Sequence, residues 1–289
     1  MARDTYPLAG RPVARVGFGA MQLPGPGVFG PPRDRDQAIA VLRRAVEAGV
    51  QHIDTSQYYG PDVANELIHA ALHPYPEDLV IVSKVGAQRD EVGGWVPAQT
   101  PAELRSGVED NLRALDVDRL GAVNLRRLND LGVTPVALED QLAEMVALRD
   151  EGKIAGIGIS TAPLEEVEVA IRDAAITCVQ NAYSLVDRRD DPVLERCLAA
   201  GVAYVPYFPL GSAFPGMPKV ADDPRVQAVA ERVGATPPQV GLAWLLARAE
   251  NVLLIPGTSS RAHLDENLAV RDLELSDADL AELADASPA

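Results

Sequence analysis

Three polar residues stand where short apolar runs end, and their types could carry out a proton transfer. Asp54 ends the run His52–Asp54, Tyr59 follows five residues later, and Lys84 lies at the end of the run that starts at Val80. An ammonium group near a phenol lowers the pKa of the phenol from about 10, and a carboxylate can hold that ammonium in place. A tyrosine tuned in this way could protonate a carbonyl oxygen while hydride reaches the carbon. The alternative is a buried Asp54–Lys84 ion pair with Tyr59 at the rim.

Two glycine pairs resemble the start of a dinucleotide-binding fingerprint. They are Gly17-Phe18-Gly19 and Gly156-Ile157-Gly158, but Gln22 and Thr161 stand where the third glycine belongs. We therefore interpret both as glycines that let strands and loops pack closely.

His69 and His73 lie four residues apart on a predicted helix, a spacing that can present two metal ligands on one face. The segment ends at Pro74, and no third ligand stands close by in the sequence. We therefore expect a solvated helix end and no metal site.

Helix-length amphipathic segments alternate with short runs that are apolar almost throughout, as parallel strands buried on both faces should be. The eight runs are Val16–Ala20, His52–Asp54, Val80–Val85, Gly121–Leu125, Ile154–Ser160, Ile176–Gln180, Ala203–Pro206 and Val252–Pro256. This alternation predicts an α/β fold, a (β/α)8 TIM barrel, with a doubly wound sheet as the alternative. No linker divides the chain, so we expect a single domain over residues 1–289. The active site is then expected at the C-terminal face of the strands.

The formal net charge is −16, which disfavours nucleic acid and anionic membranes as partners. The most apolar stretch, Val240–Pro256, is interrupted by Arg248, Glu250 and Asn251, so it is not expected to span a membrane. The first residues lack the apolar run of a signal peptide. Two cysteines without a CxxC pair fit a reducing compartment. We expect a cytoplasmic protein that is a monomer or a weak homo-oligomer.

Several segments, in order along nearly the whole chain, resemble the aldo-keto reductase family. They are Asp54-Thr55 with Tyr59-Gly60, Lys84, Ile157–Ser160, Val179-Gln180, Pro209–Gly211, and Ile255–Ser260 continuing to Glu266-Asn267. The resemblance implies a barrel that reduces a carbonyl group, with Asp54, Tyr59 and Lys84 as catalytic residues. It also implies NADPH or NADP+ bound across the C-terminal face without a Rossmann motif, which explains the missing third glycine.

The same resemblance implies which residues hold the cofactor. Ser160 and Gln180 would bond the nicotinamide carboxamide, and Tyr207 would stack on the nicotinamide ring. Leu210 and Ser212 would meet the pyrophosphate. The remaining residues expected to bind the cofactor are Ala20, Met21, Pro256, Gly257, Thr258, Ser259, Arg261, Glu266 and Asn267.

The chain departs from the family pattern at four positions. Thr161 replaces the usual asparagine, Phe208 a usual serine, and Gly257 the lysine of many members. NADP preference would then come from hydroxyls, backbone amides and Arg261. The largest departure is Arg126, which occupies the position of a catalytic histidine.

Arginine stays charged and cannot relay a proton. Our hypothesis is that Arg126 orients the carbonyl oxygen and stabilises its developing negative charge. The alternative is a salt bridge that replaces a dispensable histidine.

Further segments resemble a bacterial subgroup of the family that reduces pyridoxal with NADPH. They include Gly19–Leu23, Gly25–Pro32, His73–Pro76, Val123–Arg126 and Tyr204–Gly211. This likeness implies reduction of pyridoxal to pyridoxine, and a fixed cation such as Arg126 would suit the ionisable ring hydroxyl of pyridoxal. The expected substrate pocket comprises Met21, Phe29, Trp95, Arg127 and Phe214.

Three alternatives stay open at this point. The substrate could be another small aldehyde or ketone. The chain could instead be a cofactor-sensing, NADPH-binding subunit with little turnover, or a barrel lyase or isomerase without a redox cofactor.

Overall fold

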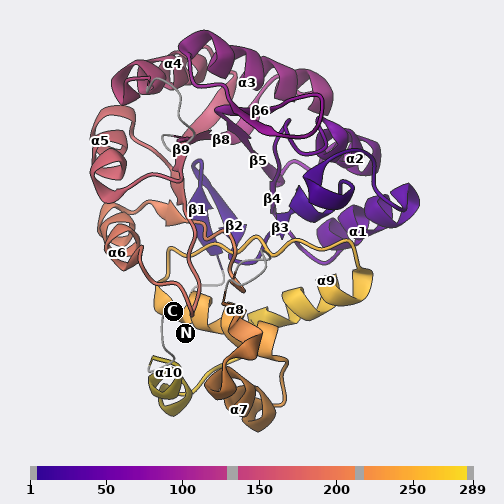
Figure 1. Cartoon of the computed structure of the whole chain (residues 1–289), viewed down its shortest axis with the longest axis vertical. Coiled ribbons are helices and arrows are strands. Elements are labelled where there is room, and N and C mark those ends of the chain that lie inside the picture. Colours follow the sequence, from indigo (N-terminus) through magenta and orange to yellow (C-terminus); the bar gives the residue numbers. More distant parts are fainter. Residues whose placement is uncertain (1–4, 129–135, 212–217, 285–289) are drawn as a thin grey trace.

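The computed structural model describes residues 5–128, 136–211 and 218–284, and in it parallel strands form a ring surrounded by helices (Figure 1). Seven strands pair in the order β11-β10-β9-β8-β5-β4-β3, each parallel to its neighbours. They are β3 (Phe18–Gly19), β4 (His52–Asp54), β5 (Val80–Val85), β8 (Leu120–Arg126), β9 (Ile154–Ser160), β10 (Cys178–Gln180) and β11 (Ala203–Tyr204). The strands are buried almost throughout, as their continuous apolar character predicts.

The eighth run, Val252–Pro256, closes the ring without forming a continuous strand. Tyr204 of β11 bridges in parallel to Val252, and Val16, just before β3, bridges in parallel to Leu254. The predicted (β/α)8 barrel is therefore confirmed, with its last strand reduced to these two bridges.

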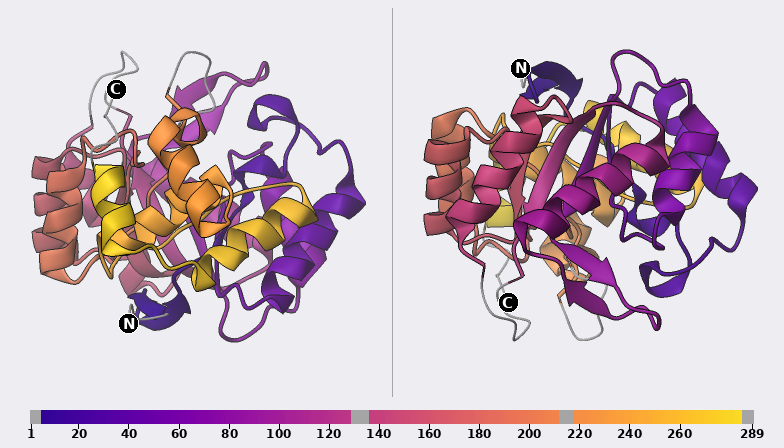
Figure 2. Two further views of the ribbon diagram at one scale, coloured as in Figure 1. Left: turned by 90° about the horizontal axis from the view of Figure 1, so that it is seen from below. Right: turned by 90° about the horizontal axis from the view of Figure 1, so that it is seen from above.

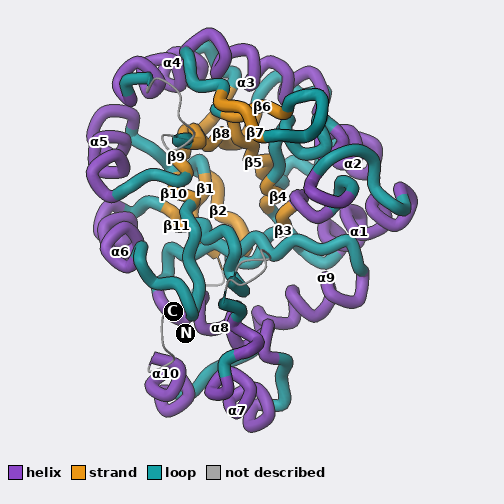
Figure 3. Tube along the Cα trace, in the orientation of Figure 1, coloured by secondary structure: helices purple, strands orange, loops and turns teal. Residues whose placement is uncertain are grey.

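Helices cover the outside of the barrel, as Figure 3 shows by the purple ring around the orange strands. Those in the described residues are α1 (Arg35–Glu47), α2 (Val63–Leu72), α3 (Pro101–Leu115), α4 (Leu138–Asp150), α5 (Leu164–Ala174), α6 (Asp191–Ala200), α7 (Pro224–Val233), α8 (Pro237–Arg248), α9 (Arg261–Leu268) and α10 (Asp277–Ala284). At several of these helices a capping side chain determines where the helix begins. Thr100 and Glu103 form a capping box before α3, with Pro101 in the first turn.

Two antiparallel hairpins, which the apolar pattern did not predict, lie at opposite ends of the barrel (Figure 2). One joins β1 (Thr5–Leu8) to β2 (Arg11–Ala14), and the other joins β6 (Ala87–Arg89) to β7 (Trp95–Pro97). Apolar side chains of the first hairpin pack against inward residues of the strands, so this hairpin closes the N-terminal end of the barrel. The second follows β5 directly and stands at the C-terminal end.

In the described part of the chain, no helix has both the length and the apolar character that crossing a membrane requires. Two of the expected site residues, Ser212 and Phe214, lie outside the described residues.

Candidate active site

Asp54, Lys84 and Gln180 form a buried polar group at the C-terminal ends of three strands. The ammonium of Lys84 forms an ion pair with Oδ1 of Asp54 and donates to the carbonyl oxygen of Thr55 at 3.0 Å. Gln180 Nε2 donates to the other carboxylate oxygen of Asp54 at 2.8 Å. Asp54 and Lys84 come from neighbouring strands, whereas Gln180 comes from β10, three strands away from β5. The barrel thus brings together residues that are far apart in the sequence.

Tyr59 lies in the loop between β4 and α2, and its ring faces the ammonium of Lys84. Lys84 Nζ lies 4.9 Å from the ring centroid. Burial first, and then the charge of Asp54, raise the pKa of the Tyr59 phenol, while Arg126 and Arg89 act in the opposite direction. The sequence predicted that Lys84 would lower the pKa of Tyr59. In the structure burial raises that pKa, and the groups that act to lower it are Arg126 and Arg89. Tyr59 is kept protonated, as a proton donor must be.

Arg126 ends β8 half-buried among aromatic side chains. Its guanidinium carbon lies 5.3 Å from the ring centroid of Trp95. Burial would lower the pKa of Arg126, but the neighbouring phenols of Tyr58 and Tyr59 raise it. Its Nε is buried and, within the described residues, has no hydrogen-bond partner. Arg126 therefore remains a cation beside Tyr58 and Tyr59, and among the described residues only its Nε is left without a partner.

Arg89 is a site residue that the sequence reasoning missed. Its guanidinium lies 3.5 Å from the ring centroid of Trp95 and donates to the carbonyl oxygen of Gly93 at 2.7 Å and of Gly27 at 3.2 Å. It also approaches the carbonyl oxygen of Tyr58, with Nε at 3.4 Å. Arg89 thus joins three loops around the site. Arg89 belongs to no recognisable motif. The only signal in the sequence is that Arg89 is a basic residue six positions before Trp95.

Ser160 and Gln180 lie side by side, because their residues pair in the register of β9 and β10. Gln180 Oε1 is buried and has no partner within residues 5–128, 136–211 and 218–284. Half-buried Tyr207 stands nearby, with its hydroxyl 3.5 Å from Oγ1 of Thr161. This corner of the site offers a donor, an acceptor and an aromatic ring.

Comparison with known proteins assigns the chain to a family. The family model described as the Aldo/keto reductase family matches residues 15–288. The chain belongs to this family. It is 49% identical over 279 residues to pyridoxine 4-dehydrogenase of Escherichia coli K12, with 96% of each chain covered.

Two aldo-keto reductase structures from Klebsiella pneumoniae have the same fold. One, in complex with NADPH, aligns with a TM-score of 0.82 at 26% identity and covers 100% of this chain and 96% of its own. The other, in complex with NADP and acetate, aligns with a TM-score of 0.80 at 25% identity and covers 99% of this chain and 96% of its own. Aldo-keto reductases are NADP-dependent oxidoreductases, and this chain is one of them.

The buried polar atoms at the strand ends fit the NADP cofactor of aldo-keto reductases. Oε1 of Gln180, which has no partner in the part of the chain that the structure describes, needs a donor, and the carboxamide of a nicotinamide has one. Thr161 and Phe208, which depart from the family pattern here, both lie in the left-handed region, with φ of 58° and 54°. A β-branched or aromatic residue is strained there, so the fold around the site must hold both in place.

The absence of the lysine that many aldo-keto reductases carry at position 257 has a steric reason. A Cβ atom on Gly257 would lie 2.5 Å from the carbonyl oxygen of Gly19, and a Cβ on Gly19 would lie 2.5 Å from that of Ile255. The backbone before Ala20 and Met21 therefore lies directly against the Pro256–Gly257 segment. Any side chain at position 257 would force this backbone apart.

The remaining residues expected to bind the cofactor extend from this contact to α9. Thr258 Oγ1 accepts from the amide of Ser260 at 3.0 Å, and the Ser259 carbonyl oxygen accepts from Gln37 on α1 at 3.4 Å. Arg261 begins α9 and lines a cavity of about 370 Å³ between α9 and α1, together with Asp36, Ile39, Ala40, Arg43, Arg44 and Glu47. Glu266 is exposed and Asn267 half-buried on the same helix.

The expected pocket residues separate into two groups. Phe29 lies against Gly93, where an added Cβ would lie 3.1 Å from its ring, and Trp95 is 39% exposed beside Arg126. Met21 is half-buried and packs against the core, as does Leu210, which was expected to meet the pyrophosphate of the cofactor.

Arg127 is different. It is buried and forms a bidentate ion pair with Glu166 of α5, with Nε and one terminal nitrogen each at 2.8 Å, and it also bonds Gln141 of α4. The structure therefore does not bring Arg127 to the group around Tyr59. Its guanidinium ties β8 to the helices outside the barrel.

Proposed function

We propose that this aldo-keto reductase reduces pyridoxal to pyridoxine with NADPH, with Tyr59 as the proton donor and Arg126 as the electrostatic partner of the substrate oxygen. The observation that carries the proposal is the buried Nε of Arg126, which has no hydrogen-bond partner among the described residues, together with protonated Tyr59 beside it. The 49% identity to a pyridoxine 4-dehydrogenase supports this choice of substrate.

Reduction of an aldehyde adds a hydride to the carbonyl carbon, which bound NADPH supplies, and a proton to the oxygen. Tyr59 holds that proton, because burial raises the pKa of its phenol. Its O–H donates to the carbonyl oxygen, and the O–H bond breaks as the alcohol forms. Arg126 and Arg89 both favour the phenolate left behind, which then takes a proton from water.

Lys84, Asp54 and Gln180 position the reacting groups rather than carry the charge change. The ion pair of Lys84 with Asp54 fixes the ammonium under the Tyr59 ring. Gln180 uses its Nε2 on Asp54, which leaves its Oε1 free for the carboxamide of the cofactor.

Arg126 would also select the substrate. The ring hydroxyl of pyridoxal ionises readily, and a fixed cation with a free donor would bind the resulting anion through a charge-assisted hydrogen bond. Trp95, which contacts both Arg89 and Arg126, would give the aromatic ring of pyridoxal a flat surface.

The proposal is tested by following NADPH absorbance in the presence of pyridoxal and identifying the product by chromatography. We expect catalytic consumption of NADPH with one equivalent of pyridoxine formed. Tight NADPH binding without turnover on pyridoxal or on p-nitrobenzaldehyde would instead support a cofactor-sensing subunit. Turnover on p-nitrobenzaldehyde alone would contradict the choice of pyridoxal.

We further propose that the protein acts in the cytoplasm as a monomer or weak homo-oligomer. Asp54, Tyr59, Lys84 and Arg126 all come from one chain, so the site needs no second copy. Sedimentation analysis at assay concentrations should show mainly monomer, and a tight obligate dimer would contradict this.

A further inference from the structure

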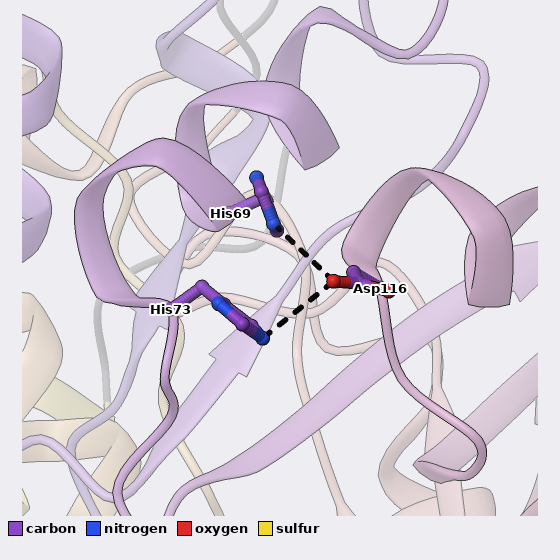
Figure 4. A group of neighbouring side chains, drawn as sticks. All are labelled: His69, His73 and Asp116. Carbon is purple, nitrogen blue, oxygen red and sulfur yellow. Dashed lines mark ion pairs between the residues drawn. The ribbon is translucent and has the colours of Figure 1, made fainter.

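We propose that His69, His73 and Asp116 form a binding site for a divalent transition-metal ion of the zinc class. The two imidazoles come from the end of α2 and the carboxylate from the end of α3, and Figure 4 shows them turned toward one another. The sequence near Pro74 predicted no third ligand. In the structure the third ligand is Asp116, at the end of the neighbouring helix α3.

Helix geometry places the two histidines on one face. His69 and His73 are four residues apart, and the amide of His73, the C-cap of α2, donates to the carbonyl oxygen of His69 at 3.0 Å. Their ring centroids lie 4.9 Å apart with planes tilted by 31°. Residues at this spacing present both imidazole nitrogens to one point beyond the helix surface.

Asp116 is held at that point by its own backbone. It caps α3 in the left-handed region, with φ of 53°, and its amide donates to carbonyl oxygens in the last turn. Tyr75 connects the two sides, because its hydroxyl donates to the carbonyl oxygen of Leu115 at 2.7 Å and its ring lies edge-on to His73. The ligands are therefore fixed relative to each other by neighbouring elements.

The distances fit a three-ligand site. Asp116 Oδ2 lies 3.9 Å from His69 Nε2 and 3.7 Å from His73 Nε2, and one ligand atom from each residue lies within 4.8 Å of the others. Zinc bonds of about 2.1 Å in a tetrahedron separate ligand atoms by about 3.4 Å, so small side-chain rotations would complete the site. All three side chains are partly exposed, which leaves room for water as the fourth ligand.

The position in the barrel indicates what such an ion would do. The ends of α2 and α3 precede β5 and β8, so the cluster lies at the N-terminal end of the strands, away from Tyr59. That end of a barrel contributes to stability rather than to catalysis. A bound ion would therefore link α2 to α3 and stabilise the fold without changing the reaction.

The experiment uses the full chain, stripped of metal by a chelator and titrated with zinc chloride in a calorimeter. We expect one equivalent to bind and the melting temperature to rise with zinc concentration. His73→Gln and Asp116→Asn should each weaken binding about tenfold or more, because each replaces an imidazole or carboxylate ligand with a neutral amide, which binds zinc weakly. The matched control, His263→Gln on the exposed face of α9, should bind zinc like the parent.

Equal zinc affinity in the parent and in both variants would overturn the proposal, as would binding of much less than one equivalent. A crystal soaked in zinc gives a measurement that does not depend on the variants folding. An anomalous difference peak between the two imidazoles and Asp116 is expected, and no peak there at full soaking would also overturn it.

Discussion

At the scale of single residues, the neighbouring arginines Arg126 and Arg127 leave β8 in opposite directions. Alternation along a strand sends one side chain inward and the next outward. Arg126 reaches Trp95 and Tyr59, whereas Arg127 reaches Glu166. The two residues have the same type and adjacent positions, so the sequence alone placed both at the pocket. Which one faces the site depends on the strand register.

Arg126 is expected to select the substrate as well as support the reaction. Arg126→His should lower kcat/KM for pyridoxal about tenfold more than kcat/KM for p-nitrobenzaldehyde, since only pyridoxal offers an ionisable ring hydroxyl. Steady-state kinetics with both aldehydes gives the ratio. Arg113→His, on the exposed face of α3, is the matched control and should leave both values unchanged. An unchanged ratio in Arg126→His would remove Arg126 from substrate selection.

At the scale of elements, predictability depended on how much of an element is buried. The strands β5, β8 and β9 are long, buried on both faces and mostly apolar, so their residues alone identify them. The hairpins β1–β2 and β6–β7 have mixed burial, and their pairing comes from turns. In the first hairpin Ala9 and Gly10 both have positive φ. Alanine rarely adopts positive φ, so its presence does not predict this turn.

The start of β4 carries a titratable group that makes stability depend on pH. His52 is buried, and burial lowers the pKa of its imidazole to about 4. Between about pH 6.5, where an unfolded histidine titrates, and pH 4, the unfolded chain binds a proton that the folded chain does not. The unfolding free energy should therefore fall with decreasing pH in this window, by up to roughly 3 kcal/mol from this group.

Urea unfolding at several pH values measures that slope. The slope is proportional to the number of protons taken up on unfolding. His52→Leu should reduce that number by about one per molecule, whereas His263→Leu, at an exposed position, should leave it unchanged. If parent and His52→Leu lose stability in parallel as the pH falls, His52 is not the group responsible.

At the scale of the whole molecule, the ring of strands is closed by bridges at Val252 and Leu254 rather than by a continuous strand. Buried Arg15 supports this connection from the first strand segment. Its guanidinium donates to the carbonyl oxygens of Val252 at 3.1 Å, Leu246 at 2.8 Å and Ala249 at 2.6 Å. One side chain thus joins the start of the barrel to the end of α8 and to the closing segment.

Arg15→Met should lower the unfolding free energy by about 2–4 kcal/mol, because it removes the donor of three carbonyl groups, one buried and two partly buried. Urea denaturation followed by circular dichroism measures the change. Arg35→Met, at an exposed position on α1, should stay within about 0.5 kcal/mol of the parent. A similar loss in both variants would show that Arg15 has no special role in closing the barrel.

The most direct test of the central claim is the turnover number of Tyr59→Phe with NADPH and pyridoxal, measured together with NADPH affinity by fluorescence titration. Phenylalanine keeps the ring over Lys84 but removes the proton that the carbonyl oxygen receives. We predict that kcat falls roughly 10³-fold while the NADPH dissociation constant stays within about twofold. Tyr75→Phe, near the opposite end of the barrel, should behave like the parent. A kcat for Tyr59→Phe within about tenfold of the parent value would contradict the account, because the proton would then come from another group.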